Sequence, residues 1–174
     1  MSEQRTLIVI LGPHRSGTSL CTAAFESLGA QLCLPEYYTN EENPRGFFEH
    51  PDIVDFNDRL LAHLGGAWDN ALFQGAQAMS MRDVSAWRAE AVGLFSGLFA
   101  ECAVAAVKDP RLCQLLEFWL SIFADCGYAK DAIFLVHVLR DPVEAALSQR
   151  NRAVDDPLFY EVGRELEEGA ALWQ

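Results

Sequence analysis

Residues 7–19 restrict the fold more than any other part of the chain. The aliphatic residues 7–11 end at Gly12, and a helix-like stretch begins near Thr18 after a short turn. A strand, a tight turn and a helix in this order can surround a phosphate with backbone N–H groups at the helix N-terminus. The segment therefore predicts an anion-binding loop that consists of Gly12, Pro13, His14, Arg15, Ser16, Gly17, Thr18 and Ser19.

The loop departs from the Walker pattern at one position. The spacing from Gly12 to Gly17 fits a P-loop, but that pattern then requires Lys followed by Ser or Thr. Here Thr18 and Ser19 follow Gly17, and the positive charge is Arg15, inside the loop. The missing lysine points away from Mg-ATP as the ligand.

Length and composition predict a single domain, 1–174, with a sizeable core. The chain has 174 residues, an apolar fraction of 51% and a net charge of −12. This charge argues against a nucleic-acid partner and disfavours a highly sulfated glycan. No apolar run reaches the ~18 residues of a membrane span, and the N-terminus lacks the pattern of a signal peptide. We therefore expect a cytoplasmic protein with no membrane span.

The cysteines are expected to be reduced structural thiols. Their number is odd, and no pair has the CxxC spacing. A disulfide framework or a metal site is therefore disfavoured. The cysteines are Cys21, Cys33, Cys102, Cys113 and Cys126.

Apolar runs separated by helical patterns predict an α/β fold. The fold expected is a three-layer P-loop-type arrangement, with a central parallel sheet flanked by helices on both faces. His137, inside the third predicted strand, is expected to be a core histidine. Strands are predicted at 7–11, 102–107 and 132–139, loops at 31–50 and 66–80, and helices at 17–28, 51–64, 82–100, 112–126, after Pro142 and at 157–174.

Each predicted strand ends in a loop that carries a positive side chain: Arg15, Lys108 and Arg140. The carboxyl ends of parallel strands share one edge of the sheet, where ligands bind, so these cations should converge. Taken singly, Lys108 and Arg140 are equally well explained as surface ion pairs. Ser148 lies about two helical turns after Asp141, on the same helix face, and can share an anion with Arg140.

At these positions the chain resembles the sulfotransferases that use 3′-phosphoadenosine 5′-phosphosulfate (PAPS), in particular their bacterial and carbohydrate-type members. Their first loop reads Pro-x-(Lys/Arg)-Ser-Gly-(Thr/Ser)-(Thr/Ser), which residues 13–19 match. Their second signature, an apolar strand followed by Arg and later by Ser, matches Arg140 and Ser148. The resemblance implies that the loop binds the 5′-phosphosulfate of PAPS, that Arg140 and Ser148 bind the 3′-phosphate, and that adenosine 3′,5′-bisphosphate is the product.

Transfer of a sulfuryl group to a hydroxyl requires charge stabilisation and a base. By analogy with phosphoryl transfer, the protein mainly positions the reactants and stabilises negative charge. Arg15 and the amides of the loop are assigned to that charge, and Lys108 matches a strand-end lysine of the cytosolic members. Pro110 stands where those members have their catalytic His. A sulfate ester carries less charge than a γ-phosphate, so no metal is expected.

Glu49 is the leading candidate for the base, because other branches of the family use a Glu from the segment after the first helix. A carboxylate beside two phenylalanines is expected to have a raised pKa. The alternative is that Glu49 provides a negative charge near the N-terminus of the helix at 51–64. His50 is the second candidate and Asp109 the third, with helix capping as the alternative for both. The acceptor pocket is predicted to include Tyr37, Tyr38 and Arg45.

Three functional hypotheses remain open. The leading one is a sulfotransferase that acts on a hydroxyl of a carbohydrate, a lipid or a small metabolite. A small-molecule kinase of the P-loop type is disfavoured because no Lys follows Gly17. The third is a non-catalytic nucleotide-binding relative. Members of the family usually continue beyond the point where this chain stops, so a C-terminally short domain is expected, which favours this third hypothesis.

Overall fold

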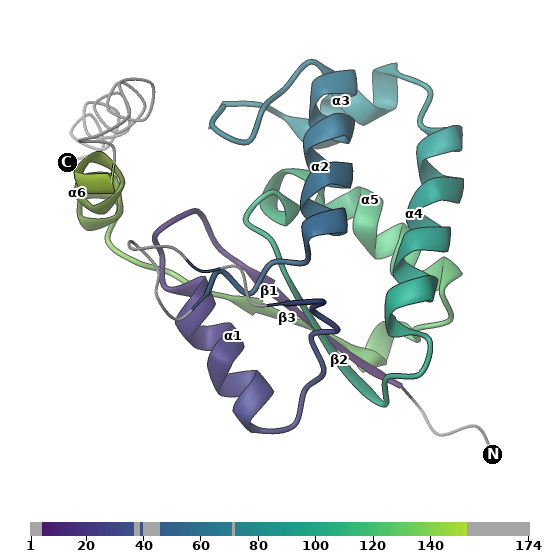
Figure 1. Ribbon diagram of the computed structural model, residues 1–174. Coiled ribbons are helices and arrows are strands. Elements are labelled where there is room, and N and C mark those ends of the chain that lie inside the picture. Colours follow the sequence, from purple (N-terminus) through teal and green to yellow (C-terminus); the bar gives the residue numbers. More distant parts are fainter. Residues whose placement is uncertain (1–4, 37–38, 40–45, 71, 153–174) are drawn as a thin grey trace.

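The computed structural model describes residues 5–36, 39, 46–70 and 72–152, with the backbone alone for 149–152. Its described part contains a three-stranded parallel sheet and six α-helices (Figure 1). The predicted α/β class with a parallel sheet is therefore confirmed. The helix predicted at 157–174 lies outside the described residues, as do Tyr37, Tyr38 and Arg45.

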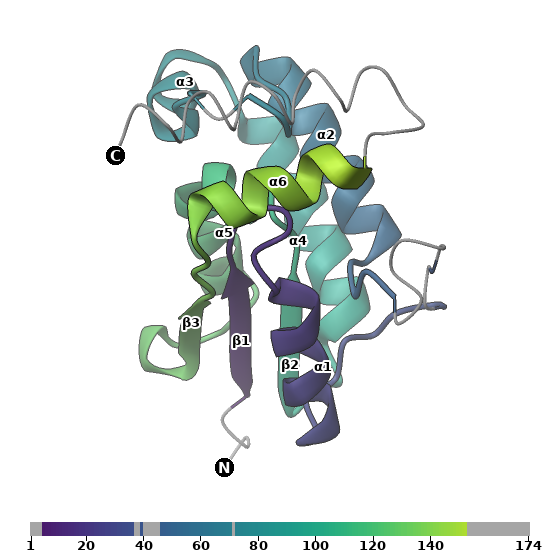
Figure 2. The same cartoon turned by 90° about the vertical axis from the view of Figure 1, so that its left-hand side faces the viewer.

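The first strand, β1 (Thr6–Leu11), lies in the middle of the sheet. It pairs in parallel with β2 (Val104–Lys108) on one side and with β3 (Ile133–His137) on the other. Val9, for example, lies opposite Val107 and Leu135. All three strands therefore end at one edge of the sheet, and the helix α6 (Pro142–Arg152) lies across that edge (Figure 2).

Helices cover both faces of the sheet, because alternate residues of β1 point to opposite sides. Ile8 and Ile10 face the helix α1 (Thr18–Ser27), while Leu7 and Val9 belong to the larger core. None of the described helices is both long and apolar enough to cross a membrane. The larger core is formed with α2 (Pro51–Leu64), α4 (Ser85–Phe99) and α5 (Leu112–Asp125).

The helix predicted at 82–100 is present as α4, and its apolar side chains contribute to the core. Phe95 and Phe99 of α4 are almost completely buried, and the ring centroid of Phe95 lies 4.9 Å from that of Phe123 in α5. Aromatic rings packed in this way supply much of the buried apolar area of a small domain. These side chains therefore stabilise the fold as part of the core.

The prediction of a loop over 66–80 is wrong in its second half, where a short helix, α3 (Gly75–Met81), is found. This helix packs on α5, and the approach is closest at Gly75. A Cβ atom at Gly75 would lie 1.9 Å from the backbone oxygen of Gln114 in α5. A seven-residue helix is too short to show a clear hydrophobic period, which is why the sequence pattern did not predict it.

The prediction of a strand covered on both faces is wrong for β3. Its side chains Phe134 and Leu135 are 54% and 47% exposed. His137, predicted to be a core histidine, is exposed at the end of this strand. The reason is position, because β3 is at the edge of the described sheet and pairs there with β1.

The close approach at Gly75 predicts a large effect of a small substitution. Gly75→Ala should lower the free energy of unfolding by about 1–3 kcal/mol, because the added methyl group forces α3 away from α5. Gly93→Ala is the matched control in α4, since its Cβ would meet nothing within 4 Å. That control should gain about 0.5–1 kcal/mol from the better helix propensity of Ala. Urea unfolding of both variants measures the difference, and equal effects would contradict the described packing of α3.

Candidate functional site

The loop at residues 12–17 connects β1 to α1 and is held in shape by short contacts. Gly12 has a φ of +156°, and a Cβ atom there would lie 2.7 Å from Ser16 Oγ and 2.8 Å from the backbone oxygen of Val138. Ser16 Oγ donates to the backbone oxygen of Pro13 at 2.7 Å. The hydroxyl of Ser16 therefore closes the loop from within. Gly17, with a φ of +99°, is the N-cap residue of α1.

A pocket of about 360 Å³ opens at the carboxyl edge of the sheet. It brings together the three cations predicted to converge, Arg15, Lys108 and Arg140. Other predicted site residues do not line it: Gly12, Pro13, Ser16, His50 and Ser148. The lining residues are His14, Arg15, Gly17, Thr18, Ser19, Leu20, Ala23, Phe47, Phe48, Glu49, Lys108, Pro110 and Arg140.

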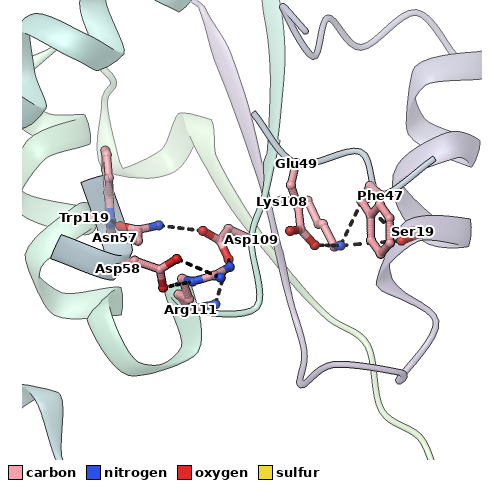
Figure 3. A network of polar contacts seen from close by, with 9 residues as sticks. All are labelled: Ser19, Phe47, Glu49, Asn57, Asp58, Lys108, Asp109, Arg111 and Trp119. Atoms are coloured by element: carbon pink, nitrogen blue, oxygen red, sulfur yellow. Dashed lines mark hydrogen bonds and ion pairs between the residues drawn. The ribbon is translucent and has the colours of Figure 1, made fainter. Parts of the chain in front are cut away.

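Lys108, the last residue of β2, is 4% exposed and lines this pocket. Its Nζ forms an ion pair with Glu49 and donates to the backbone oxygen of Phe47 at 3.0 Å. It also lies 3.5 Å from Ser19 Oγ, in the first turn of α1 (Figure 3). A buried ammonium needs such partners, because an unpaired charge away from water is very costly.

Glu49 has the environment that was expected of a base. Its side chain is 14% exposed. Burial raises the pKa of the Glu49 carboxyl group, while the neighbouring charge of Lys108 opposes the rise. The partner of its carboxylate is Lys108, at the end of β2. Glu49 therefore has a contact other than the N-terminus of α2, which was the alternative explanation for its charge.

His50 is the N-cap of α2 and not a wall of the pocket. Its Nδ1 accepts a hydrogen bond from the backbone N–H of Asp52 at 3.2 Å, and the side chain is buried. Burial lowers the pKa of His50, so the ring tends to be neutral and able to accept this bond. The geometry therefore supports the capping alternative for His50 over the catalytic one.

Arg140 and Ser148 both contact the loop at residues 12–17, but through different partners. Arg140 Nη1 donates to the backbone oxygen of Arg15 at 3.0 Å. Ser148 Oγ, which was expected to act beside Arg140, accepts instead from Arg15 Nε at 3.0 Å. Asp141 accepts from the backbone N–H of Val143 at 2.9 Å and so caps α6, which carries Ser148. The second predicted signature thus lies directly against the first.

A buried polar network beside Lys108 was missed by the sequence reasoning. Asp109 is fully buried, and its carboxylate accepts from Asn57 Nδ2 at 2.9 Å and from Arg111 Nη1 at 3.0 Å (Figure 3). Asn57 in turn accepts from Trp119 Nε1 at 2.8 Å. Asp109, the third candidate for the base, therefore has a structural role in this network and does not line the pocket. One signal was present, because Asn57 is a polar residue on the apolar face of the predicted helix 51–64.

Two pocket residues have a backbone conformation that L-residues rarely adopt. Arg15 has a φ of +67° and Phe48 a φ of +57°. Such conformations cost energy, and they cluster at functional sites, where the surrounding structure holds them. His14, also in the pocket wall, packs edge-on against Trp68 with ring centroids 4.9 Å apart. The shape of the loop is therefore determined by its surroundings as well as by its glycines.

Together these groups form a site for an anion next to a carboxylate. Positive side chains from three strand ends meet the N-terminus of α1, which itself favours negative charge. Glu49, with its raised pKa, can take a proton from a neighbouring hydroxyl. Among the described residues, no group of His, Cys, Asp and Glu side chains is arranged to hold a metal ion.

Comparison of this chain with protein-family models, with curated proteins and with solved structures finds no match. The function proposed below therefore rests on the residues of the site and on their chemistry.

The raised pKa of Glu49 predicts a pH dependence of stability. Because the folded state favours the protonated carboxyl group, the contribution of Glu49 is fully present below the ordinary Glu pKa. It is lost as the pH rises through the raised pKa. We expect the free energy of unfolding of the wild type, relative to Glu49→Gln, to fall as the pH rises from about 4 to about 8.

Urea unfolding at a series of pH values measures this difference. Glu117→Gln is the matched control, because Glu117 is exposed on α5, and its difference from the wild type should show a much weaker trend. A wild-type advantage over Glu49→Gln that grows with pH would contradict the described environment of Glu49.

Proposed function

We propose that this chain is a PAPS-dependent sulfotransferase, which transfers a sulfuryl group from PAPS to a hydroxyl of a carbohydrate, a lipid or a small metabolite. The observation that carries the proposal is the pocket in which Arg15, Lys108 and Arg140 lie together with the carboxylate of Glu49. An anion-binding loop that has Arg15 and no lysine after Gly17 supports a sulfate-bearing nucleotide over Mg-ATP. The finer fold that we propose is the three-layer P-loop type.

The residues of the loop fit the phosphosulfate end of such a nucleotide. A glycine is required at position 12, since a side chain there would collide with Ser16 and Val138. Arg15 can donate to two oxygens at once and is always charged. On this proposal the 5′-phosphosulfate is bound by His14, Arg15, Gly17, Thr18 and Ser19, which line the pocket, while Gly12, Pro13 and Ser16 shape the loop from within.

Arg140 and Ser148 fit the 3′-phosphate. Both already contact Arg15, through its backbone oxygen and its Nε respectively. A nucleotide whose phosphosulfate lies at Arg15 would therefore have the guanidinium of Arg140 and the hydroxyl of Ser148 available for its 3′-phosphate. Charge-assisted hydrogen bonds of this kind are about twice as strong as neutral ones.

PAPS supplies the sulfuryl group, and the chain supplies charge stabilisation and a proton acceptor. Glu49 takes the proton of the attacking hydroxyl, which its burial favours by raising the pKa of the carboxyl group. Lys108 lines the pocket, and its Nζ is held 3.0 Å from the backbone oxygen of Phe47. With Arg15 it offsets the negative charge that develops during transfer.

A non-catalytic nucleotide-binding protein is the second candidate function. The ion pair between Lys108 and Glu49 favours it, because each buried group is already the partner of the other, and this role needs no reaction. The two candidates share the nucleotide and differ only in transfer, so binding and turnover must be measured separately.

Calorimetry with the product nucleotide tests the binding part of the proposal. Adenosine 3′,5′-bisphosphate should bind without Mg²⁺ and more tightly than Mg-ATP. Arg140→Ala should weaken the bisphosphate by about 10- to 100-fold, since a charge-assisted bond is worth ~1.5–3 kcal/mol. The effect on adenosine 5′-monophosphate should be much smaller, because that ligand lacks the 3′-phosphate.

Glu144→Gln is the matched control for this measurement. Glu144 accepts from Arg140 Nε at 3.2 Å and is exposed, so the variant removes a neighbour of Arg140 and keeps the guanidinium. Its affinity for the bisphosphate should not fall. Tighter binding of Mg-ATP would contradict the sulfotransferase proposal, and equal losses for both adenosine nucleotides would contradict the role of Arg140.

The turnover part of the proposal is tested with Glu49→Gln. This variant should bind the bisphosphate within a few-fold of the wild type, while transfer from labelled PAPS to a panel of sugars, alcohols and phenols falls about 10²- to 10⁴-fold. Glu36→Gln, at an exposed position nearby in the sequence, should leave the rate unchanged. An unchanged rate in Glu49→Gln would exclude Glu49 as the base. Intact binding without transfer in the wild type would favour the non-catalytic candidate.

A further inference from the structure

Two free thiols lie in contact near the start of β2. Cys33 Sγ and Cys102 Sγ are 3.1 Å apart, although the two residues are far apart in the sequence. All five cysteines belong to the described residues and are free. The others have different neighbours: Cys113 Sγ accepts from the backbone N–H of Gly12, and Cys126 Sγ from Ser96 Oγ.

The backbone holds the two thiols in this arrangement. Gln31 N donates to the backbone oxygen of Val104 at 2.8 Å, and the backbone oxygen of Gln31 accepts from Ala106 N at 2.9 Å. These bonds fix the segment before Cys33 against β2, which Cys102 precedes. Cys33 itself has a φ of +53°, a conformation that is unfavourable for a residue with a Cβ atom. Like Arg15 and Phe48 in the pocket, it is kept there by its surroundings.

The two sulfurs differ in burial, because Cys102 is more deeply buried than Cys33. Cys102 is 4% exposed, and burial raises the pKa of its thiol to about 12, with the contact to Cys33 adding to the rise. Cys102 therefore keeps its proton until the second exchange. Cys33 is only partly buried. A dissolved reagent accordingly meets Cys33 first, since thiol–disulfide exchange requires a thiolate that the reagent can reach.

We propose that Cys33 and Cys102 form a reversible disulfide when the protein meets a low-molecular-weight disulfide such as oxidised glutathione. The sulfurs must approach each other by about 1 Å to reach the ~2.05 Å of a disulfide bond, which rotation of the two side chains can supply. The site is a modification site, and it is independent of the function proposed for the pocket.

The reaction proceeds by two exchanges. The thiolate of Cys33 attacks one sulfur of oxidised glutathione, forms a mixed disulfide and releases one glutathione thiolate. Cys102 then attacks Cys33 Sγ, gives up its proton and releases the second glutathione. The two protein thiols are oxidised by two electrons, and oxidised glutathione is reduced to two glutathione molecules that carry the two protons.

The bond would join two segments that both lead to the pocket. The ring of His50 is hydrogen-bonded to the backbone of Cys33, and His50 directly follows Glu49. Cys102 directly precedes the strand that ends at Lys108. A cross-link between Cys33 and Cys102 closes a long loop. It therefore restricts the unfolded chain and should raise the free energy of unfolding.

Alkylation and peptide mapping of the whole chain test this proposal. The folded protein is incubated with oxidised glutathione and then unfolded in an alkylating reagent. The reduced protein should take up five labels and the oxidised protein three, since two of the five cysteines become linked. A cross-linked peptide should contain both Cys33 and Cys102, dithiothreitol should restore all labels, and the urea midpoint should be higher for the oxidised form.

Variants supply the controls. Cys33→Ser should remove both the cross-link and the rise of the urea midpoint on oxidation, whereas Cys126→Ser should keep both. The mapping of the wild type decides the question even if a variant folds poorly. A mixed disulfide with glutathione that persists on Cys33, a cross-link to another cysteine, or no loss of labels would each overturn the proposal.

Discussion

The structure depends first on the parallel pairing of β1 with both of its neighbours. Because β2 and β3 run in the same direction as β1, the three strands end at one edge of the sheet. Arg15, Lys108 and Arg140 are far apart in the sequence, and only this alignment brings them to one pocket. The helix α6 then crosses the same edge and places Ser148 on Arg15. An antiparallel neighbour would have moved its basic residue to the opposite end of the sheet.

The pocket concentrates positive charge in a protein whose net charge is −12. The cost of this arrangement is reduced by specific partners. Lys108 is buried and is paired with Glu49, while Arg140 is held by Glu144 and by the backbone oxygen of Arg15. The pair of Lys108 and Glu49 also attaches the segment at 46–50 to the end of β2. The same contact therefore keeps a candidate base next to a candidate anion site.

A second group of buried polar contacts supports the first from behind. Asp109 directly follows Lys108, and its carboxylate is bound by Asn57 and Arg111. These bonds connect the end of β2 to α2 and to the start of α5, so the corner that presents Lys108 is held from two helices. Buried polar groups are tolerated when their hydrogen bonds are satisfied, and such networks then define one arrangement of the core.

The sequence by itself determined most element types and the parallel sheet, because aliphatic runs and helical periods are local signals. It also located Arg15, Lys108 and Arg140, because each of them follows an apolar run. Since the carboxyl ends of parallel strands share one edge of the sheet, their convergence could be predicted too. It missed α3 and the network around Asn57, and it misjudged His137. Only the tertiary structure decided that Ser148 contacts Arg15 and that Cys33 meets Cys102. Each of these depends on distances between segments far apart in the chain, and no local pattern of residues encodes such distances.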